Sequence, residues 1–326
     1  MLALIRDIDG AVRLAEREAR ALEPGLARLS VTATGVCGTD LHIAAGEYAC
    51  EPPVTMGHEI SGYVREVGSA ADAAWIGRQV VCETYYSTCG TCRQCRDGRR
   101  NLCPKRRSLG SFEDGGFADS VVVPVLNLHA VPEAIDAVSA TLAEPLACVA
   151  QCLLDPAVVE PGDRVLVLGP GAMGLLAAQV AMACGGQVTV TGLESDTKRL
   201  EWAASRGASI SLDPRADSFD TVIECSGAAP AVAAALRSAD RGARVVQVGI
   251  VGRAVELPLD MVLYKELSVT SGFASTPRSW RRALALLAEG RISFDGLITH
   301  QFHLSEWKRA FAMVGSPEAI KVALLP

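Results

Sequence analysis

The pattern of apolar positions in the second half of the chain predicts strands that alternate with helices. The run RVLVL (164–168) and the alternating segment QVTVT (187–191) enclose an Ala/Leu-rich stretch of helical character. Three further β-rich segments follow, with helical patterns such as PAVAAALRSA between them: TVIEC (221–225), RVVQVGI (244–250) and LSVTSG (267–272). The pattern predicts an α/β fold with a doubly wound parallel sheet. The connection between ASISL and TVIEC is too short for a helix.

Length and charge set further bounds on this picture. With 326 residues the chain is long enough for two domains. A net charge of −6 gives no electrostatic case for nucleic acid or an anionic membrane as partner. The longest uncharged run, 165–186, is interrupted by Pro170 and five glycines, so it predicts strand–turn–helix and no membrane span. The start MLALIRDIDG does not resemble a signal peptide, and we expect a cytoplasmic protein.

The glycine-rich turn after the first of these strands predicts dinucleotide binding. Gly169, Gly171 and Gly174 form G-x-G-x-x-G between a strand and a helix. Such glycines allow a tight turn and close backbone approach, and the following helix N-terminus can receive a pyrophosphate. Ala172 and Met173 fill the turn between the last two glycines and are expected to line the cofactor site.

The choice between NAD and NADP depends on what ends the second strand. NAD binding usually requires an acid about 20 residues after the glycine turn. Glu194 lies 20 residues after Gly174 and favours NAD, which is our expectation. If Gly192 occupies that place instead, the nearby Lys198 and Arg199 could admit the 2′-phosphate of NADP.

Residues 89–103 contain four cysteines at spacing C-x₂-C-x₂-C-x₇-C. Disulfides, a redox-active thiol pair and a metal site are the competing interpretations of Cys89, Cys92, Cys95 and Cys103. Eleven cysteines is an odd number, and a reducing cytosol disfavours disulfides. Four thiolates complete a closed tetrahedral zinc site, which we predict here. Several arginines lie in or beside this segment, so a nucleic-acid-binding zinc ribbon is the alternative, although the acidic whole disfavours it.

Two short segments nearer the N-terminus supply a second set of metal ligands. GVCGTDLH (35–42) and MGHEISG (56–62) contain Cys37, His58 and Glu59. Three protein ligands plus water make an open, catalytic zinc site. Each piece alone is weak evidence, since a single cysteine after an apolar run is usually a core residue.

In their order along the chain, these segments resemble the zinc-dependent medium-chain dehydrogenase/reductase (alcohol dehydrogenase) family, in its sorbitol/threonine dehydrogenase branch. GGFADSVVVP (115–124), EPLACV (144–149), GPGAMG (169–174) and the tail with LITHQF and IKVALLP extend the resemblance over nearly the whole chain. It implies a mostly β GroES-like catalytic domain at 1–148 and a Rossmann domain at 149–272. The last part, 273–326, is then expected to return to the catalytic domain.

The resemblance also implies a role for each residue of the second ligand set. Cys37 and His58 would be ligands of a catalytic zinc, and Glu59 would ligate it directly or alternate with water. Glu144 stands where liver-type alcohol dehydrogenases place another cysteine, and the resemblance leaves open whether it contacts the metal or its water.

Three further residues match a supporting set around that zinc. Asp40 would orient the zinc-bound histidine, Thr39 would take the substrate's proton, and His42 would be the outer member of the proton relay. With the cysteine lobe as a structural site, the resemblance implies two zinc ions per chain.

The expected function is NAD(P)-linked oxidation of a secondary alcohol to a ketone, with a polyol, sugar alcohol or vicinal amino or hydroxy alcohol as substrate. Alternatives are a zinc-independent quinone or enone reductase and a non-catalytic nucleotide-binding protein of the same fold. We expect a small-molecule substrate, no nucleic-acid partner and assembly as a homodimer or homotetramer.

Overall fold

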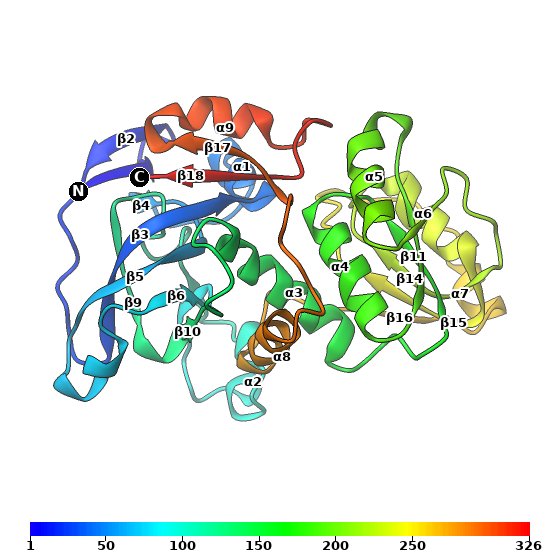
Figure 1. Ribbon diagram of the computed structural model, residues 1–326, viewed down its shortest axis with the longest axis horizontal. Coiled ribbons are helices and arrows are strands. Elements are labelled where there is room, and N and C mark those ends of the chain that lie inside the picture. The colour runs from blue at the N-terminus through cyan, green and yellow to red at the C-terminus, as the bar shows by residue number, and fades with distance from the viewer. The chain divides into compact units, whose positions relative to one another are not determined.

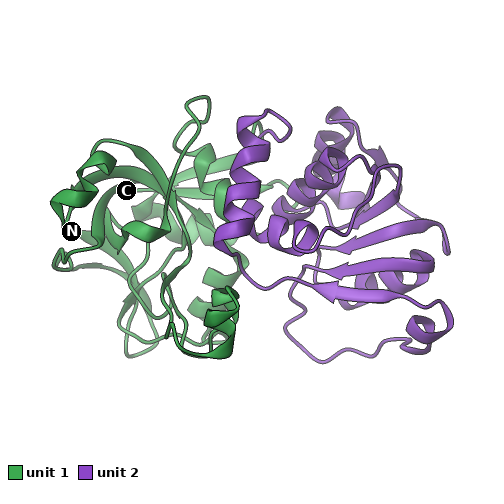
Figure 2. Ribbon diagram, turned by 90° about the horizontal axis from the view of Figure 1, so that it is seen from below, with its two compact units in different colours: residues 1–144, 294–326 green, residues 145–293 purple.

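The computed structural model describes residues 1–326 and divides into two compact units (Figure 2). Unit 1 consists of Met1–Glu144 and Phe294–Pro326, and unit 2 of Pro145–Ser293. Both chain ends therefore belong to unit 1, as the N and C labels on the green ribbon show (Figure 2), and Figure 1 marks the same two ends on the ribbon coloured along the chain. From the sequence we expected the chain to return to the first domain at residue 273, whereas in the structure it returns at Phe294, about one helix later.

Unit 1 is built around β-sheets. Its main sheet has the order β10-β6-β5-β3-β18-β17, and β9 pairs with β3 in addition. The strands of this sheet are β3 (Leu26–Val36), β5 (Glu59–Val67), β6 (Gln79–Cys82), β9 (Ser120–Pro124), β10 (Leu128–Ala130), β17 (Ile298–His303) and β18 (Lys321–Leu325). A small sheet comprises β1 (Leu2–Arg6), β2 (Val12–Glu16) and β4 (Val54–Thr55), and β7 (Tyr85–Ser87) pairs with β8 (Arg107–Ser108).

Helices in unit 1 are short. The α-helices are α1 (Gly38–Ala45), α2 (Arg93–Arg96) and α9 (Trp307–Met313). The 3₁₀ turns are η1 (Ala70–Trp75), η2 (Arg100–Leu102), η3 (Val125–Asn127), η4 (Ser139–Leu142) and η6 (Leu304–Glu306). Strands therefore dominate this unit, which confirms the mostly β character expected for it.

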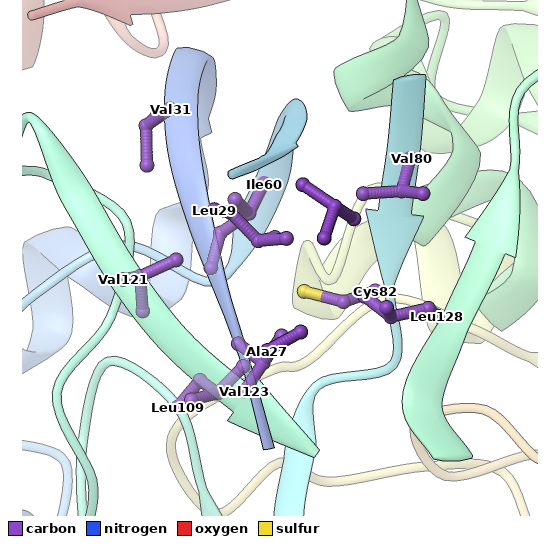
Figure 3. Packing of buried hydrophobic residues seen from close by; sticks show 11 residues of the cluster. Ala27, Leu29, Val31, Ile60, Val80, Cys82, Leu109, Val121, Val123 and Leu128 are labelled. Atoms are coloured by element: carbon purple, nitrogen blue, oxygen red, sulfur yellow. The ribbon is translucent and has the colours of Figure 1, made fainter. Parts of the chain in front are cut away.

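One face of the main sheet forms the core of unit 1. Along the first half of β3 every second residue is buried, so Ala27, Leu29 and Val31 point to the same side (Figure 3). They pack with eight further buried residues from β5, β6, β9, β10 and a nearby loop. Burial of each such Val or Leu side chain contributes about 1.5–3 kcal/mol, so this cluster holds β3 and β5 together.

Unit 2 contains a six-stranded parallel sheet of order β13-β12-β11-β14-β15-β16. The strands that follow β11 are added on one side of it up to β13, and the later strands are added on its other side. This is the order of a doubly wound dinucleotide-binding sheet, as predicted. The strands are β11 (Arg164–Leu168), β12 (Gln187–Thr191), β13 (Ser209–Ile210), β14 (Phe219–Glu224), β15 (Ala239–Gln247) and β16 (Ser268–Ser271). The helices are α3 (Ala143–Leu154), whose first two residues belong to unit 1, α4 (Ala172–Ala183), η5 (Glu194–Asp196), α5 (Thr197–Ser205), α6 (Ala229–Ser238), α7 (Asp260–Tyr264) and α8 (Pro277–Ala288).

Helix α8 belongs to unit 2, which corrects the expected boundary at residue 273. The Thr276 hydroxyl caps the start of α8 and also donates a 2.8 Å hydrogen bond to Gln151 in α3. Beyond the end of α8, the Gln179 side chain of α4 bonds both the amide and the carbonyl of Ser293, the last residue of unit 2. Because the start of α8 and the segment that follows it are bonded to helices of unit 2 and Trp280 is fully buried, the helix packs in this unit.

The connection from β13 to β14 contains no helix, as the sequence predicted. Ile210 on β13 and Leu212 just after it are partly exposed. Elsewhere in the chain, no helix combines the length and the apolar character that a membrane crossing requires.

Candidate metal centres and cofactor site

Cys37 marks the point where β3 gives way to α1. Its extended backbone (φ −107°) ends the strand, and the Asp40 side chain accepts the Cys37 amide hydrogen at 2.9 Å. This hydrogen bond satisfies an amide that the helix itself leaves unpaired. The turn therefore fixes the Cys37 thiol at the N-terminal end of α1.

His58 and Glu59 enter from the neighbouring strand. Gly57 has φ +88°, and a side chain there would come within 2.7 Å of the Phe117 ring, so only glycine fits. Glu59 opens β5 and pairs directly with Gly35 of β3. Through this pairing, one ligand atom each from Cys37, His58 and Glu59 lies within 4.8 Å of the others.

Asp40 supports this cluster electrostatically. Its Oδ1 lies 3.5 Å from His58 Nδ1, and its side chain is completely buried. Burial alone would lower the pKa of His58, but the charge of Asp40 and its hydrogen bond raise the pKa well above the ordinary value. A carboxylate behind an imidazole fixes the ring's orientation and tautomer, which is the arrangement found behind metal-bound histidines.

A residue that we did not expect at this site is Lys321 at the start of β18. Its Nζ lies 2.5 Å from Oε1 and 2.5 Å from Oε2 of Glu59. Burial raises the pKa of Glu59, while Lys321 and His58 act in the opposite direction. In the sequence, a lysine inside IKVALLP gave no sign of this contact.

Glu144 lies near this cluster but is not part of it. It is buried in the first turn of α3, and its Oε1 accepts a 2.7 Å hydrogen bond from the Thr84 hydroxyl. Its negative charge acts on Glu59 and raises the pKa of that carboxyl. Glu144 is therefore a neighbour of the group formed by Cys37, His58 and Glu59, and it is hydrogen-bonded to Thr84.

Thr39 and His42 lie on α1, next to the Cys37 ligand. Thr39 Oγ1 is 3.7 Å from Cys37 Sγ. The His42 ring is half exposed, and its Nδ1 lies 2.7 Å from a carboxylate oxygen of Glu47. Thr39 is thus beside the candidate metal ligands, whereas His42 is at the solvent edge with a carboxylate to orient it.

The four cysteines of the 89–103 lobe also come together, with their sulfur atoms all within 4.8 Å of one another. Cys89 Sγ lies 3.6 Å from Cys103 Sγ and 4.0 Å from Cys95 Sγ. Four thiolates at the usual ~2.3 Å from zinc would be about 3.8 Å apart in a tetrahedron. The spacing and the all-sulfur donor set fit a closed zinc site.

Backbone amides in the lobe already favour thiolate at one of these positions. The amides of Thr91 and Cys92 point at Cys89 Sγ and lower the pKa of that thiol to about 6. Since the thiolate is the form that binds metal, this arrangement prepares Cys89 as a ligand at neutral pH.

In unit 2 the glycine turn follows β11 directly. Gly169 has φ +94°, and a side chain there would come within 2.7 Å of Ser226. Gly171 precedes α4, whose first amides have no side-chain cap. Ala172 and Met173 form the first turn of α4, and a side chain at Gly174 would overlap the Gly169 carbonyl. This turn leaves the N-terminus of α4 open to a phosphate group.

The end of β12 contains no acidic side chain. Gly192 follows the strand, and a side chain there would come within 2.8 Å of Pro170. Glu194 lies further on, exposed in η5. Asp196, which the sequence did not single out, is buried and accepts a hydrogen bond from the Leu193 amide (2.9 Å). Arg199 Nη1 lies 3.1 Å from the other oxygen of Asp196.

Unit 2 thus contains a glycine turn of the dinucleotide-binding type, and unit 1 contains two thiol-containing groups that could each hold a metal ion, a combination found in metal- and nucleotide-dependent oxidoreductases. Residues 23–133 match the family profile "Alcohol dehydrogenase GroES-like domain", and residues 172–289 match "Zinc-binding dehydrogenase". With these matches and a relative that is 37% identical over its full length, the chain belongs to the zinc-dependent medium-chain dehydrogenase/reductase family.

That relative is the sorbitol dehydrogenase of Halalkalibacterium halodurans, for which the alignment covers 100% of this chain and 99% of the relative. D-arabitol-phosphate dehydrogenase of Enterococcus avium is 33% identical, covering 91% of this chain and 88% of the relative. Among solved structures, a protein of Sinorhizobium meliloti described as a zinc-binding dehydrogenase bound to NADP superposes with a TM-score of 0.90. It is 32% identical, and the superposition covers 100% of this chain and 99% of that one.

Proposed function

We propose that this chain is a zinc-dependent dehydrogenase that oxidises a secondary alcohol to a ketone and transfers the hydride to NAD(P). The observation that carries the proposal is the grouping of Cys37, His58 and Glu59, with Asp40 behind the histidine. One thiolate, one imidazole and one carboxylate make a ligand set suited to zinc with a position left open. The family and its named relatives, which act on CH–OH groups, agree with this activity.

Zinc held by these ligands would supply a Lewis acid that lowers the pKa of an alcohol hydroxyl. The chain's own groups then deal with the proton. Thr39, beside Cys37, is the hydroxyl placed to receive it, and His42 with Glu47 can release it to solvent. Asp40 keeps the His58 ring oriented throughout.

The four-cysteine lobe is proposed to hold a second zinc with a structural role. A site with four protein thiolates has no position left for substrate. Its effect would be to connect the start and end of the 89–103 loop, which contains little regular structure. We retain the cytoplasm as the proposed compartment, because both thiol-containing sets must stay reduced to bind metal.

We propose a hydroxyl-rich substrate, such as a polyol or a vicinal amino or hydroxy alcohol. Glu144 places an acceptor carboxylate close to the metal ligands, with Thr84 holding one of its oxygens. A site with polar groups that pair with a second hydroxyl penalises substrates that lack it, because those groups would stay unpaired. The names of the sorbitol and arabitol-phosphate relatives support the same class.

For the cofactor, we propose that NAD and NADP are used with little discrimination. Our expectation of NAD rested on Glu194, which is exposed beyond the strand end. Position 192, directly after the strand, is a glycine, so it has no carboxylate that could select the ribose of NAD. The charge of Arg199, which would favour NADP, is paired with Asp196. The NADP-bound neighbour shows that the larger cofactor suits a related fold.

We propose a homo-oligomer that assembles through the edge strand β16. The outer edge of β16 is unpaired in the sheet, and Val269 on it is 53% exposed. Leu263 and Tyr264 on the preceding α7 are each more than 70% exposed. An apolar, open strand edge is a site at which a second copy can pair. Val269→Lys should lower the mass measured by light scattering, while an exposed lysine change such as Lys308→Met should leave it unchanged.

Two measurements on the purified protein test the activity. Metal analysis should find two zinc ions per chain, and the absorbance of reduced nicotinamide should rise with secondary alcohols. The panel is sorbitol, xylitol, 2,3-butanediol, threonine, 2-butanol and 1-octanol. A zinc-free chain that reduces enones would favour the quinone-reductase alternative, and cofactor binding without turnover would favour a non-catalytic protein. If 1-octanol or 2-butanol is the best substrate, the polyol class is wrong.

A further inference from the structure

The ion pair between Lys321 and Glu59 is among the most enclosed in the chain. The Lys321 side chain is 7% exposed and that of Glu59 is 1% exposed. Both carboxylate oxygens lie 2.5 Å from the ammonium nitrogen. Two charges so far from water are costly unless they are paired, and in this pair only Oε1 of Glu59 accepts a hydrogen bond, whereas its Oε2 has no hydrogen-bond partner.

The backbone around the pair is shaped to admit it. Lys321 opens β18, which runs antiparallel to β3, and Gly35 of β3 faces Glu59 across the sheet. A side chain at Gly35 would overlap Glu59 Oε2 and lie 3.0 Å from Lys321 Cε. Glycine at position 35 therefore leaves room for the carboxylate and the ammonium to meet beside Cys37.

Lys321 faces more negative charge than Glu59 alone. The charges of Cys37 and Glu144 act on it as well. With Cys37 as thiolate, these three groups would leave a divalent metal in a net negative environment, and Lys321 offsets one of those charges. The same ammonium also competes with a metal ion for the oxygens of Glu59.

We propose that Lys321 is a positioning residue of the catalytic metal site. It holds Glu59 beside the metal ligands but shares its carboxylate, so Glu59 acts as an exchangeable ligand and a coordination position can open for substrate. This inference rests on the proposed catalytic site at Cys37, His58 and Glu59. It gives the C-terminal strand a part in metal chemistry, although none of its residues is a ligand.

The test compares Lys321→Met with the control Lys308→Met. Lys308 is an exposed lysine on α9 that contacts only solvent and the Trp307 ring among the interactions described. We expect Lys321→Met to release zinc to a chelator more slowly than wild type, by about tenfold or more, because the buried charge of Glu59 then has only the metal to compensate it. The visible absorption of the cobalt-substituted protein should change for Lys321→Met and stay unchanged for Lys308→Met. Turnover number should fall with little change in KM for the cofactor.

Two further variants keep the test decisive. If Lys321→Met is unstable, Lys321→Met/Glu59→Gln removes both charges and should recover folding, with zinc release faster than in wild type because the carboxylate is gone. Lys321→Arg keeps the charge and should restore most of the wild-type cobalt spectrum. Unchanged zinc release and cobalt spectrum in folded Lys321→Met, or faster zinc loss from it, would overturn the proposal. If the cobalt spectrum of Cys37→Ser is the same as that of the wild-type protein, the proposed metal site itself is overturned.

Discussion

Asp40 links the two segments that carry the candidate metal ligands: it accepts the Cys37 amide with one oxygen, and its other oxygen lies 3.5 Å from His58 Nδ1. One side chain thus sets the position of the thiolate's backbone and the orientation of the imidazole. Asp40→Asn keeps the size and one acceptor but removes the charge behind His58.

We expect Asp40→Asn to weaken zinc binding at this site by about 10- to 100-fold, the range typical of such supporting carboxylates. Competition with a chromogenic chelator, followed separately for the two proposed zinc sites, measures the effect. Zinc at the cysteine lobe should be unaffected, which provides the internal control. Equal loss from both sites would indicate a general folding defect.

The two cysteine-containing sites should respond differently to the loss of one thiol. Cys37→Ala should abolish turnover and leave the melting temperature close to that of wild type, because an open site carries the chemistry. Cys95→Ala should mainly lower thermal stability, because it breaks a closed site that restrains a loop. Activity assays and melting curves on both variants, with zinc analysis, check this. An unchanged melting temperature for Cys95→Ala would contradict the structural role.

Thr39→Val keeps the side-chain shape and removes the hydroxyl next to Cys37. We expect alcohol oxidation to fall by about 10²-fold or more, as is usual for loss of a positioned proton acceptor. His42→Ala should have a milder effect, since its ring is half exposed and water can take its place. Cofactor affinity, measured by nicotinamide fluorescence, should not change in either variant. A fully active Thr39→Val would exclude Thr39 from the proton path.

Cofactor use provides a test of the end of β12. We expect kcat/KM values for NAD and NADP that agree within about tenfold, a difference of about 1.4 kcal/mol or less. Arg199→Ala should shift the preference toward NAD, because it removes a cation that could pair with a 2′-phosphate and leaves the Asp196 carboxylate without this counter-charge. Lys308→Met serves as the control. A wild-type preference far above tenfold in either direction would contradict the proposal.

Arg164 links three neighbouring strands at the amino-terminal end of the same sheet, because it contacts Asp220 on β14 and Asp240 on β15. Its hydrogen bond lowers the pKa of Asp220 from 3.8 to about 2. Since the folded-state pKa is lowered, the stabilisation is complete above pH 3.8 and is lost as the pH falls from 3.8 toward 2. The pair is partly exposed, so Asp220→Asn should cost only about 0.5–1 kcal/mol. Urea unfolding should give the same loss in the free energy of unfolding for Asp220→Asn at pH 5 and at pH 8. If this loss differs between the two pH values, the ion pair with Arg164 is not its cause.

Much of the architecture was predictable because it depends on local pattern. Strand and helix periodicity, the glycine turn after RVLVL and the cysteine spacing are each encoded within a few residues. The sequence order of the strands around the turn was enough to predict the doubly wound sheet. The grouping of Cys37 with His58 required more, namely the family resemblance, because two residues in separate segments do not reveal by themselves that they lie close together.

The predictions that failed or were missing concern long-range partners. The amphipathic pattern of α8 shows that one face is buried but not which unit buries it, and the boundary at 273 was wrong for that reason. Lys321 lies in an apolar C-terminal strand, where a lysine usually reaches solvent, and only the pairing of β18 with β3 brings it to Glu59. The hydrogen bond of Thr84 to Glu144 joins residues 60 positions apart and has no sequence pattern.

The discontinuity of unit 1 has a consequence for biosynthesis. Cys37, His58 and Glu59 leave the ribosome early, and all of unit 2 follows before β18 is made. Domains usually fold as units during translation, but here the first unit has to wait for its last strand. Until β18 is inserted beside β3, Glu59 lacks Lys321 as its counter-charge. A chain in which β18 is not yet inserted would therefore hold Glu59 without its counter-charge, and the group of Cys37, His58 and Glu59 would reach its final charge balance only once β18 is in place.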